Sequence, residues 1–332
     1  MVDPANEAAR KIAILGPQHA NPILREVLDS ESMPGPYVLV AAGWEEREAE
    51  TGSLESHLGV SVQNLGAWPA CETAFEKDSE LKKLMFARYD RMRELTRVYR
   101  VRMSAELGAL RTLFARTNPA APDDLVGPEL EPAFEALRAL DDLHRGRVAA
   151  LNDETFARAH ERDSLREGTE RMAEMLAGAG TLLIAGGHVG ILYNRMRLFR
   201  VLDHLNPGAG IAGWSAGGMV LTDTLLLFHD SPPRGAGDAE VHGPGFGIAH
   251  GIVALPHAST RLHLDDQARV AILSRRMAPA LVTALDGGQC ALLGGAGEWS
   301  FRGGARLLRP GGQVEDASDS GREPALSPGG TA

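Results

Sequence analysis

The sequence predicts an α/β protein in which a mostly parallel sheet is flanked by helices and interrupted by a large helical insertion. Short apolar runs alternate with helix-spaced segments near both ends of the chain, which is the pattern of βαβ units. These runs are apolar throughout, as expected of strands in a sheet that is covered on both faces. We therefore expect an α/β domain built from residues 1–68 and 177–308, with residues 69–176 inserted as helices.

The first part of this domain supplies one βαβ unit. Residues 11–15 and 36–42 are apolar runs that end at glycine, and residues 22–28 between them have helical spacing. Residues 60–65 form a third candidate strand. Because strands joined through a helix run parallel, the sheet is expected to begin as a parallel one.

The insertion is expected to consist of long amphipathic helices. Apolar residues from Leu81 to Leu110 follow three- and four-residue steps, which predicts one helix or two placed end to end. Prolines near residue 120 break this pattern, and further helical stretches cover residues 130–143 and 154–175. We expect the insertion to pack on itself or on a partner chain, with a substrate-selecting cap as the alternative.

One polar cluster of the insertion resembles a metal site in composition. Asp141, Asp142 and His144 lie close together in the sequence, but no second pair of ligands follows them. We therefore expect a solvated helix face at this point and no metal.

The last part of the domain carries the remaining strands. Four apolar runs read as strands, namely residues 181–185, 210–212, 252–255 and 281–285. Residues 219–226 read as an apolar helix that contains Asp223. Residues 309–332 are rich in glycine, proline, serine and acidic residues, and we expect a disordered tail there.

Composition restricts the class of function. The 332 residues are 44% apolar and 23% charged, which is an ordinary globular composition. The net charge of −10 argues against a general nucleic-acid role, because phosphates require a basic surface. The two cysteines are far apart, the first ten residues lack a secretory pattern, and no apolar run reaches about 20 residues. We expect a soluble, cytoplasmic protein without a membrane partner.

The strongest chemical signal is a serine between an apolar strand and an apolar helix. Residues 213–217 read Gly-Trp-Ser-Ala-Gly, the G-x-S-x-G pattern that places a nucleophile on a sharp strand-to-helix turn. Ser215 is the expected nucleophile, and the amide of Ala216 is the natural oxyanion donor because it opens the helix. A backbone amide of Gly186-Gly187, in the turn after residues 181–185, is expected to supply a second donor.

A serine hydroxyl requires a base and an orienting acid. His257 directly follows an apolar strand, where parallel sheets present functional groups. His242 and His250 flank a glycine-rich loop and are less well placed. Either Asp230 or Asp286 would hold the imidazole, and the sequence pattern leaves both open.

Four segments together resemble peptidase family S51, the group of dipeptidase E and cyanophycinase. They are Ala41-Ala42-Gly43-Trp44-Glu45-Glu46-Arg47-Glu48, Ala185-Gly186-Gly187-His188, Gly213-Trp214-Ser215-Ala216-Gly217 and Pro256-His257-Ala258-Ser259-Thr260-Arg261. The resemblance implies a class I glutamine amidotransferase-like fold and roles for Ser215, His257, Gly187 and Ala216. It covers about the first 68 residues and residues 178–305, and leaves out the insertion.

The resemblance also ranks the two acids. In dipeptidase E the acid follows the nucleophilic serine by fifteen residues, and this spacing from Ser215 corresponds to Asp230, our first choice. The glutamate of cyanophycinase is replaced here by Gly287, next to the second choice, Asp286. His188 and Ala258 also depart from the family pattern, where Asn or Asp and Phe are usual.

The resulting expectation is a serine peptidase or amide hydrolase that cleaves a small peptide or isopeptide. Arg261 and Arg47 are expected to bind an acidic group of the substrate. No cofactor and no metal is expected, and the apolar stripes of the insertion would also suit a homodimer. The alternative is a catalytically inactive scaffold that binds or assembles through its helical insertion.

Overall fold

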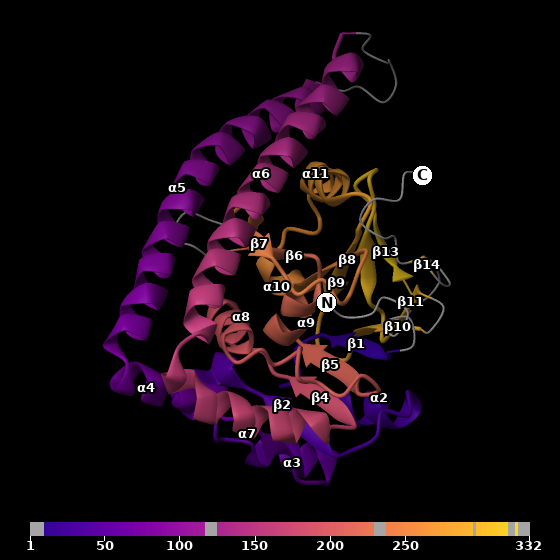
Figure 1. The fold of residues 1–332 in the computed structure, drawn as a ribbon. Coiled ribbons are helices and arrows are strands. Elements are labelled where there is room, and N and C mark those ends of the chain that lie inside the picture. The colour runs from indigo at the N-terminus through magenta and orange to yellow at the C-terminus, as the bar shows by residue number, and fades with distance from the viewer. Residues whose placement is uncertain (1–9, 117–124, 229–236, 295–296, 318–322, 325–332) are drawn as a thin grey trace.

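The computed structural model describes residues 10–116, 125–228, 237–294, 297–317 and 323–324. Its main sheet has eight strands in the order β14-β11-β10-β1-β5-β4-β2-β3 (Figure 1). Five of them run parallel, namely β1 (Ile12–Leu15), β5 (Gly210–Trp214), β4 (Thr181–Ile184), β2 (Tyr37–Val40) and β3 (Gln63–Asn64). Antiparallel strands extend one edge, namely β10 (Cys290–Leu293), β11 (Glu298–Arg302) and β14 (Glu323–Pro324). The predicted α/β class with a mostly parallel sheet is confirmed.

Helices cover both faces of this sheet because its central strands are apolar on both sides. In β1, Ile12 and Ile14 pack with one buried cluster, whereas Ala13 and Leu15 pack with another. The first cluster includes residues of α7 (Arg166–Ala177), α8 (Val189–Leu198) and α9 (Ala216–Leu221). The second includes residues of α2 (Leu24–Ser30) and α3 (Gly52–Leu58).

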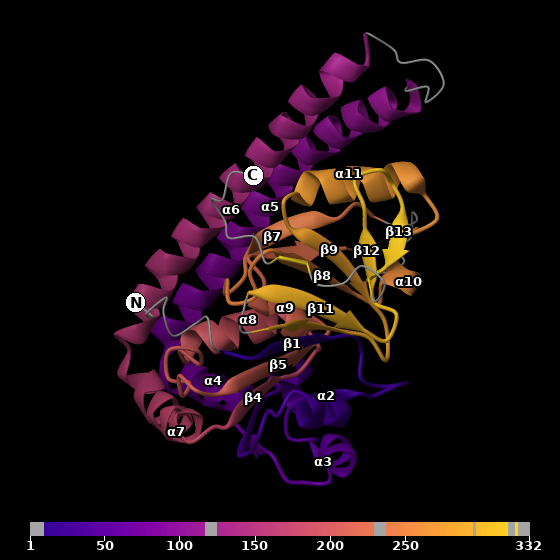
Figure 2. The ribbon, with the colours of Figure 1, turned by 90° about the vertical axis from the view of Figure 1, so that its right-hand side faces the viewer.

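The strands predicted at residues 252–255 and 281–285 form, but in a second sheet. That sheet has the order β13-β12-β9-β8, in which β13 is Val314–Asp316 and β12 is Arg306–Leu308. Strand β8 (Ile252–Pro256) runs parallel to β9 (Leu281–Leu285). Beside it lie α10 (Ala258–Arg261) and α11 (Gln267–Met277) (Figure 2). Strand signals do not specify which strands pair, so the sequence did not separate the two sheets.

The helix predicted over residues 219–226 is wrong in its second half. Helix α9 ends at Leu221, and residues Thr224–Leu227 form β6. This strand pairs antiparallel with β7 (Glu240–Pro244). A short apolar run fits a helix or a strand equally well until its partner is known. Asp223 consequently lies in a turn after α9 and not within a helix.

Residues 309–317 differ from the expected disordered tail. Val314–Asp316 forms β13, which pairs antiparallel with β12 (Arg306–Leu308). The turn between them is closed by Arg309, whose amide donates to the carbonyl of Gln313 at 2.9 Å. Polar composition gave no hint of this pairing, because the strand is an exposed edge.

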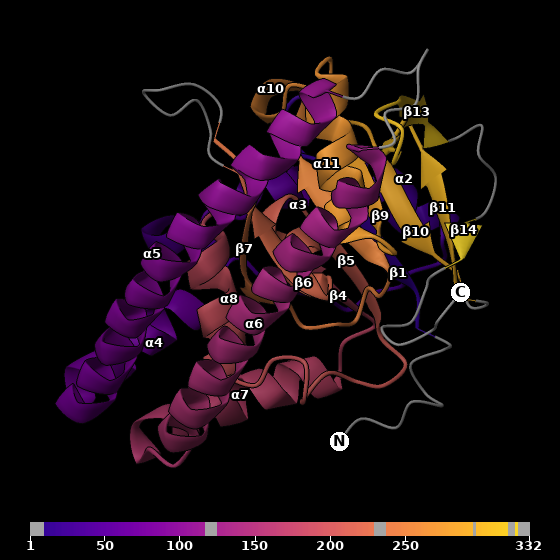
Figure 3. The same cartoon turned by 90° about the horizontal axis from the view of Figure 1, so that it is seen from above.

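The segment predicted as an insertion contains α4 (Ala67–Lys77), α5 (Ser79–Arg116), α6 (Gly127–His160), the short helix η2 (Asp163–Leu165) and α7. Helices α5 and α6 form a long hairpin that lies along the α/β part and projects beyond it (Figures 1 and 3). No helix in the part of the chain that the structure describes combines the length and the apolar character that a membrane crossing requires.

The hairpin is fastened to the body by a buried ion pair. Arg276 of α11 donates to both carboxylate oxygens of Asp141 at 2.6 and 2.8 Å, and the hydroxyl of Tyr99 also donates to Asp141. The ring of His144 stacks on Tyr99, with the centroids 4.2 Å apart. The expectation of a solvated face is therefore wrong for Asp141 and His144, whereas Asp142 is exposed and pairs with Arg145.

Candidate active site

Ser215 lies in the turn between β5 and α9 with φ 50° and ψ −120°. A non-glycine residue rarely adopts positive φ, and such strain concentrates at functional sites. The turn is tight enough to exclude side chains at its glycines. A Cβ on Gly213 would lie 2.5 Å from the carbonyl oxygen of Gly217, and one on Gly217 would lie 2.0 Å from that of Ile184. The pattern Gly-Trp-Ser-Ala-Gly thus produces the strained serine that the sequence predicts.

The turn at Gly186 and Gly187 lies against this serine. A Cβ on Gly186 would lie 3.0 Å from the Cβ of Ser215 and 3.7 Å from its Oγ. Gly187 has φ 107°, and its Cα packs on the backbone of Gly43. The next amide, that of His188, donates to the carbonyl of Gly43 at 2.8 Å. Three of the segments that resemble family S51 therefore meet here.

Two amides remain available at this junction. Neither Gly187 nor Ala216 donates to any of the turn, loop or cap hydrogen bonds formed within the described ranges. Ala216 is the first residue of α9, whose first amides have no acceptor inside the helix. A helix N-terminus and an adjacent glycine turn are the arrangement that can hold a developing oxyanion.

His257 lies at the same edge of the molecule as Ser215. The amide of Ser215 donates to the carbonyl of Leu15, at the end of β1, at 3.0 Å. Gly16, which follows β1, contacts Asp286, which follows β9, because a Cβ on Gly16 would lie 1.9 Å from the carbonyl oxygen of Asp286. The amide of His257 donates to the carbonyl of Leu285 at 3.0 Å. The carboxyl ends of β5, β1, β9 and β8 therefore converge.

The backbone of His257 is also unusual. It has φ 57° and ψ 31°, in the left-handed region, and it precedes the short helix α10. The side chain is partly exposed. The described non-glycine residues with positive φ are Ser32, Glu45, Arg200, Ser215 and His257, and the last two stand at the two strand ends where the sequence predicts chemistry.

The structure separates the two candidate acids only in part. Asp230 lies outside the described residues. The carboxylate of Asp286 accepts hydrogen bonds from the amide and hydroxyl of Ser259, at 3.2 and 2.5 Å, and pairs with Arg306. Asp286 thus joins the turn after His257 to β12.

The two arginines expected to bind substrate are placed differently. Arg47 is exposed and pairs with Glu50 at 2.7 Å, and this carboxylate raises the pKa of Arg47. Arg261 ends α10, and its guanidinium lies 5.9 Å from the ring centroid of Phe228. Arg261 is separated from His257 only by the rest of the short helix α10, whereas Arg47 lies four residues after Gly43.

A cavity of about 620 Å³ lies beside the Gly43 turn. Its lining includes five glutamates, namely Glu45, Glu46, Glu48, Glu72 and Glu76. Glu48 is buried, and this burial raises its pKa although the amides of Ala67 and Trp68 donate to it. Arg47 is not part of this acidic lining, and its expected role in substrate binding stays a prediction.

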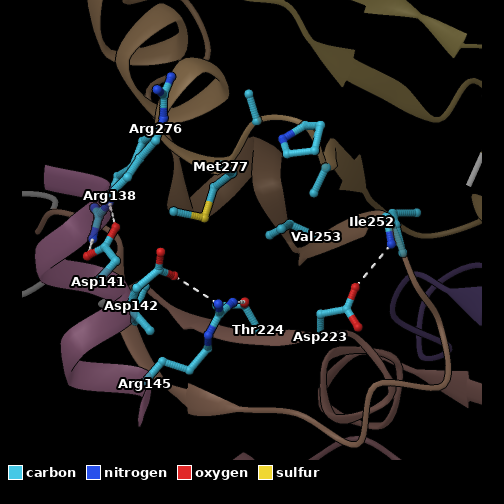
Figure 4. Close-up of a pocket in the computed structure, with 15 residues that line it drawn as sticks. Arg138, Asp141, Asp142, Arg145, Asp223, Thr224, Ile252, Val253, Arg276 and Met277 are labelled. Carbon is cyan, nitrogen blue, oxygen red and sulfur yellow. Dashed lines mark hydrogen bonds and ion pairs between the residues drawn. The ribbon is translucent and has the colours of Figure 1, made fainter. Parts of the chain in front are cut away.

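A second cavity, of about 350 Å³, lies away from the serine. It is lined by charged residues of α6 and by the amino-terminal ends of β8 and β9 (Figure 4). Within it Arg145 pairs with Asp142 at 2.8 Å and donates to the hydroxyl of Thr224 at 2.9 Å. His257 lies at the opposite end of β8, about 16 Å along the strand.

Sequence analysis missed a histidine–carboxylate pair. Nδ1 of His250 lies 2.7 Å from a carboxylate oxygen of Asp223, and the other oxygen accepts from the amide of Gly251. This pair lies beyond the C-terminus of α9, about 9 Å along the helix from Ser215 at its N-terminus. It braces the turns after α9 and before β8, and it does not face the nucleophile.

The two cysteines are poorly suited to act as nucleophiles. Both cysteines are buried, which raises the pKa of Cys71 to about 12 and that of Cys290 to about 11. Their thiols therefore stay protonated at neutral pH. Among the described residues, no group of three or more His, Cys, Asp or Glu side chains is arranged to hold a metal ion.

No protein-family model matches this sequence, and no curated protein matches it. The solved structures similar to this chain include the crystal structure of a peptidase from an acI-B1 Actinobacterium. That chain is 13% identical, the alignment covers 98% of this chain and 96% of that one, and the TM-score is 0.48.

Proposed function

We propose that this chain is a serine-type peptidase or amide hydrolase that acts on a small peptide or isopeptide. The observation that carries the proposal is the strained backbone of Ser215, with φ 50°, at a strand-to-helix turn that faces Gly186 and Gly187. Strain of this kind costs roughly 1–3 kcal/mol and persists where it aims a side chain for chemistry. The resemblance of four segments to family S51 supports the same assignment.

The proposed mechanism gives each group one role. His257 removes the proton of the Ser215 hydroxyl as Oγ attacks the carbonyl carbon of the amide. The amides of Gly187 and Ala216 hold the resulting oxyanion. The carbon–nitrogen bond then breaks, and the imidazolium returns its proton to the leaving amine. Water, deprotonated by His257, hydrolyses the acyl ester and frees Ser215.

A fluorophosphonate probe tests the nucleophile directly. We expect the unaltered protein to be labelled and the Ser215→Ala variant to be unlabelled. Ser53→Ala removes an exposed serine of α3 and is the matched control, which should label fully. Product analysis by mass spectrometry after incubation with a dipeptide and isopeptide library then identifies the bond that is cleaved. Labelling that persists in Ser215→Ala would assign the reaction to another residue.

The competing function is a catalytically inactive scaffold that binds a partner. It is favoured by Gly287 at the position of the cyanophycinase glutamate and by the engagement of Asp286 with Arg306 and Ser259. The two functions differ in turnover. A protein that is folded, does not label at Ser215 and leaves the whole peptide library intact would be a scaffold.

A further inference from the structure

Arg88 of α5 is a buried guanidinium whose hydrogen bonds go to a neutral group. Its side chain is 5% exposed, and Nε and Nη2 donate to Oδ1 of Asn152 at 2.9 and 2.5 Å. Within the described parts of the chain, no carboxylate forms an ion pair with it. Burial lowers the pKa of Arg88 to about 10, so the group stays charged at neutral pH. A buried charge without a counter-ion is costly, which points to an anion that completes it.

Two further buried polar atoms near Arg88 lack a hydrogen bond of good geometry, and a weak mutual interaction is the one contact that they share. They are Nδ2 of Asn152, which is 1% exposed, and Oη of Tyr193, which is 4% exposed. The Asn152 amide is oriented by Arg88, because its oxygen accepts both guanidinium bonds and its nitrogen therefore points elsewhere. An amide nitrogen donates, and a tyrosine hydroxyl can donate. Buried groups of this kind are nearly always satisfied by a water or a ligand.

Several cationic side chains lie near these donors, and two of them are already paired, Arg197 with Asp153 at 2.9 Å and Arg100 with Glu240 at 2.8 Å. Burial lowers the pKa of His242, in β7, to about 4, and the charges of Arg88, His144, His188 and Arg100 lower it further in that order. His242 is therefore neutral at pH 7 and can donate or accept without adding charge. Arg197 lies on the same aromatic ring as Arg88, with the two guanidinium carbons 5.2 and 5.1 Å from the Phe156 centroid. An anion is the ligand that this environment favours.

The cluster lies within reach of the candidate active site. Tyr193 is five residues beyond His188, which caps α8 directly after the Gly186–Gly187 turn. Five helical residues span about 7.5 Å, and two extended peptide residues span about 7 Å. Helix α8 packs against both α6, which carries Asn152, and α9, which begins beside Ser215. Two residues of extended chain are thus similar in length to this stretch of α8.

We propose that Arg88, Asn152 and Tyr193 form a subsite for a carboxylate group of the substrate. The hairpin α5–α6 would then select substrate, because it supplies Arg88 and Asn152. The subsite rests on the proposed function for its place in a reaction, but its affinity for a carboxylate does not depend on turnover. The carboxylate has two sources, an acidic side chain or the C-terminus of the peptide, and the chemistry is the same for both.

The first arm measures binding without catalysis, in the full chain carrying Ser215→Ala. Succinate and N-acetylaspartate are titrated calorimetrically, with succinamide and N-acetylasparaginamide as their neutral counterparts. We expect the carboxylates to bind and the amides not to bind. Adding Tyr193→Phe should weaken carboxylate binding roughly tenfold, and adding Arg88→Met roughly a hundredfold, as hydrogen bonds to charged groups predict.

The matched controls lie on the exposed face of α5. Arg91→Met removes a guanidinium three residues from Arg88, and Tyr89→Phe removes a hydroxyl one residue from it. Both variants should leave carboxylate binding unchanged. Tyr193→Phe keeps the aromatic ring, whose centroid lies 4.9 Å from that of Phe246, and is therefore expected to fold. It tests the subsite even if Arg88→Met does not fold. Equal carboxylate affinity in Tyr193→Phe and the unaltered site, or an ordered water alone beside Arg88 after a crystal soak with succinate, would overturn the proposal.

The second arm uses cleavable dipeptides and identifies the source of the carboxylate. Loss of turnover when an aspartate side chain is changed to asparagine assigns the subsite to the side chain. Loss when the C-terminus is amidated assigns it to the C-terminus. In either case Tyr193→Phe should raise KM and leave kcat within about twofold, because the subsite binds ground and transition states alike. If the protein binds carboxylates but is never labelled at Ser215, the proposed function is wrong and the subsite stands.

Discussion

Gly186 and Ser215 are in contact across the turns that follow β4 and β5, since a Cβ on Gly186 would lie 3.0 Å from the Cβ of Ser215. Gly186→Ala should therefore displace the nucleophile and lower kcat at least tenfold, because catalytic geometry tolerates little misplacement. It should also lower the free energy of unfolding by about 1–3 kcal/mol, as overpacking does. Gly52→Ala is the control, because a Cβ there meets no atom within 4 Å. Full activity in Gly186→Ala would contradict this placement.

Ser215 should respond differently to glycine and to alanine. Both substitutions remove Oγ and abolish turnover, but only glycine adopts φ 50° without strain. Ser215→Gly is therefore expected to be about 1 kcal/mol more stable than Ser215→Ala. Urea denaturation monitored by circular dichroism measures the difference. Equal stability would mean that the serine turn stores no backbone strain.

Asp286 and Asp230 should differ in their effect on catalysis. If Asp230 orients His257, then Asp230→Asn lowers kcat by roughly 10⁴-fold, the loss seen when a triad acid is changed to its amide. Asp286→Asn should have a smaller effect, about tenfold, because Asp286 holds the turn at Ser259 directly and also pairs with Arg306. Steady-state kinetics of the two variants decides between them. A larger loss for Asp286→Asn would transfer the triad role to that residue.

The junction between α4 and α5 should make stability depend on pH. Asp78 pairs with Arg162 at 2.8 Å and caps α5 at the amide of Leu81, and the Arg162 hydrogen bond is the main cause of its lowered pKa. A carboxyl with a lowered pKa stabilises the folded state above its unfolded pKa of about 4, and this contribution is lost as the pH falls further.

Asp78→Asn should therefore be less stable than the unaltered protein at pH 7, and the gap should narrow as the pH falls from about 5 toward 2. Asparagine still caps a helix, so the difference reports the charge. Asp90→Asn, an exposed position on α5 with a 3.8 Å pair to Arg93, is the control. A gap that is constant with pH would show that the Asp78 charge contributes nothing.

Local sequence predicted the elements that neighbouring residues specify. The strand, glycine-flanked serine and helix around Ser215 are contiguous, so the pattern alone predicted the turn. The position of His257 after a strand was predicted in the same way. The helix assigned to residues 219–226 failed because its partner, Glu240–Pro244, lies more distantly in the chain.

The sequence by itself therefore determined the α/β class, the helical insertion and the serine turn, because periodicity and short motifs are local properties. Tertiary structure alone decided that Asp141 is buried, because its partner Arg276 is 135 residues away. It also decided which groups surround Arg88, because Asn152 is 64 residues from it and Tyr193 lies on another helix. Burial and charge pairing depend on residues that meet only when the chain folds, and no sequence window contains them.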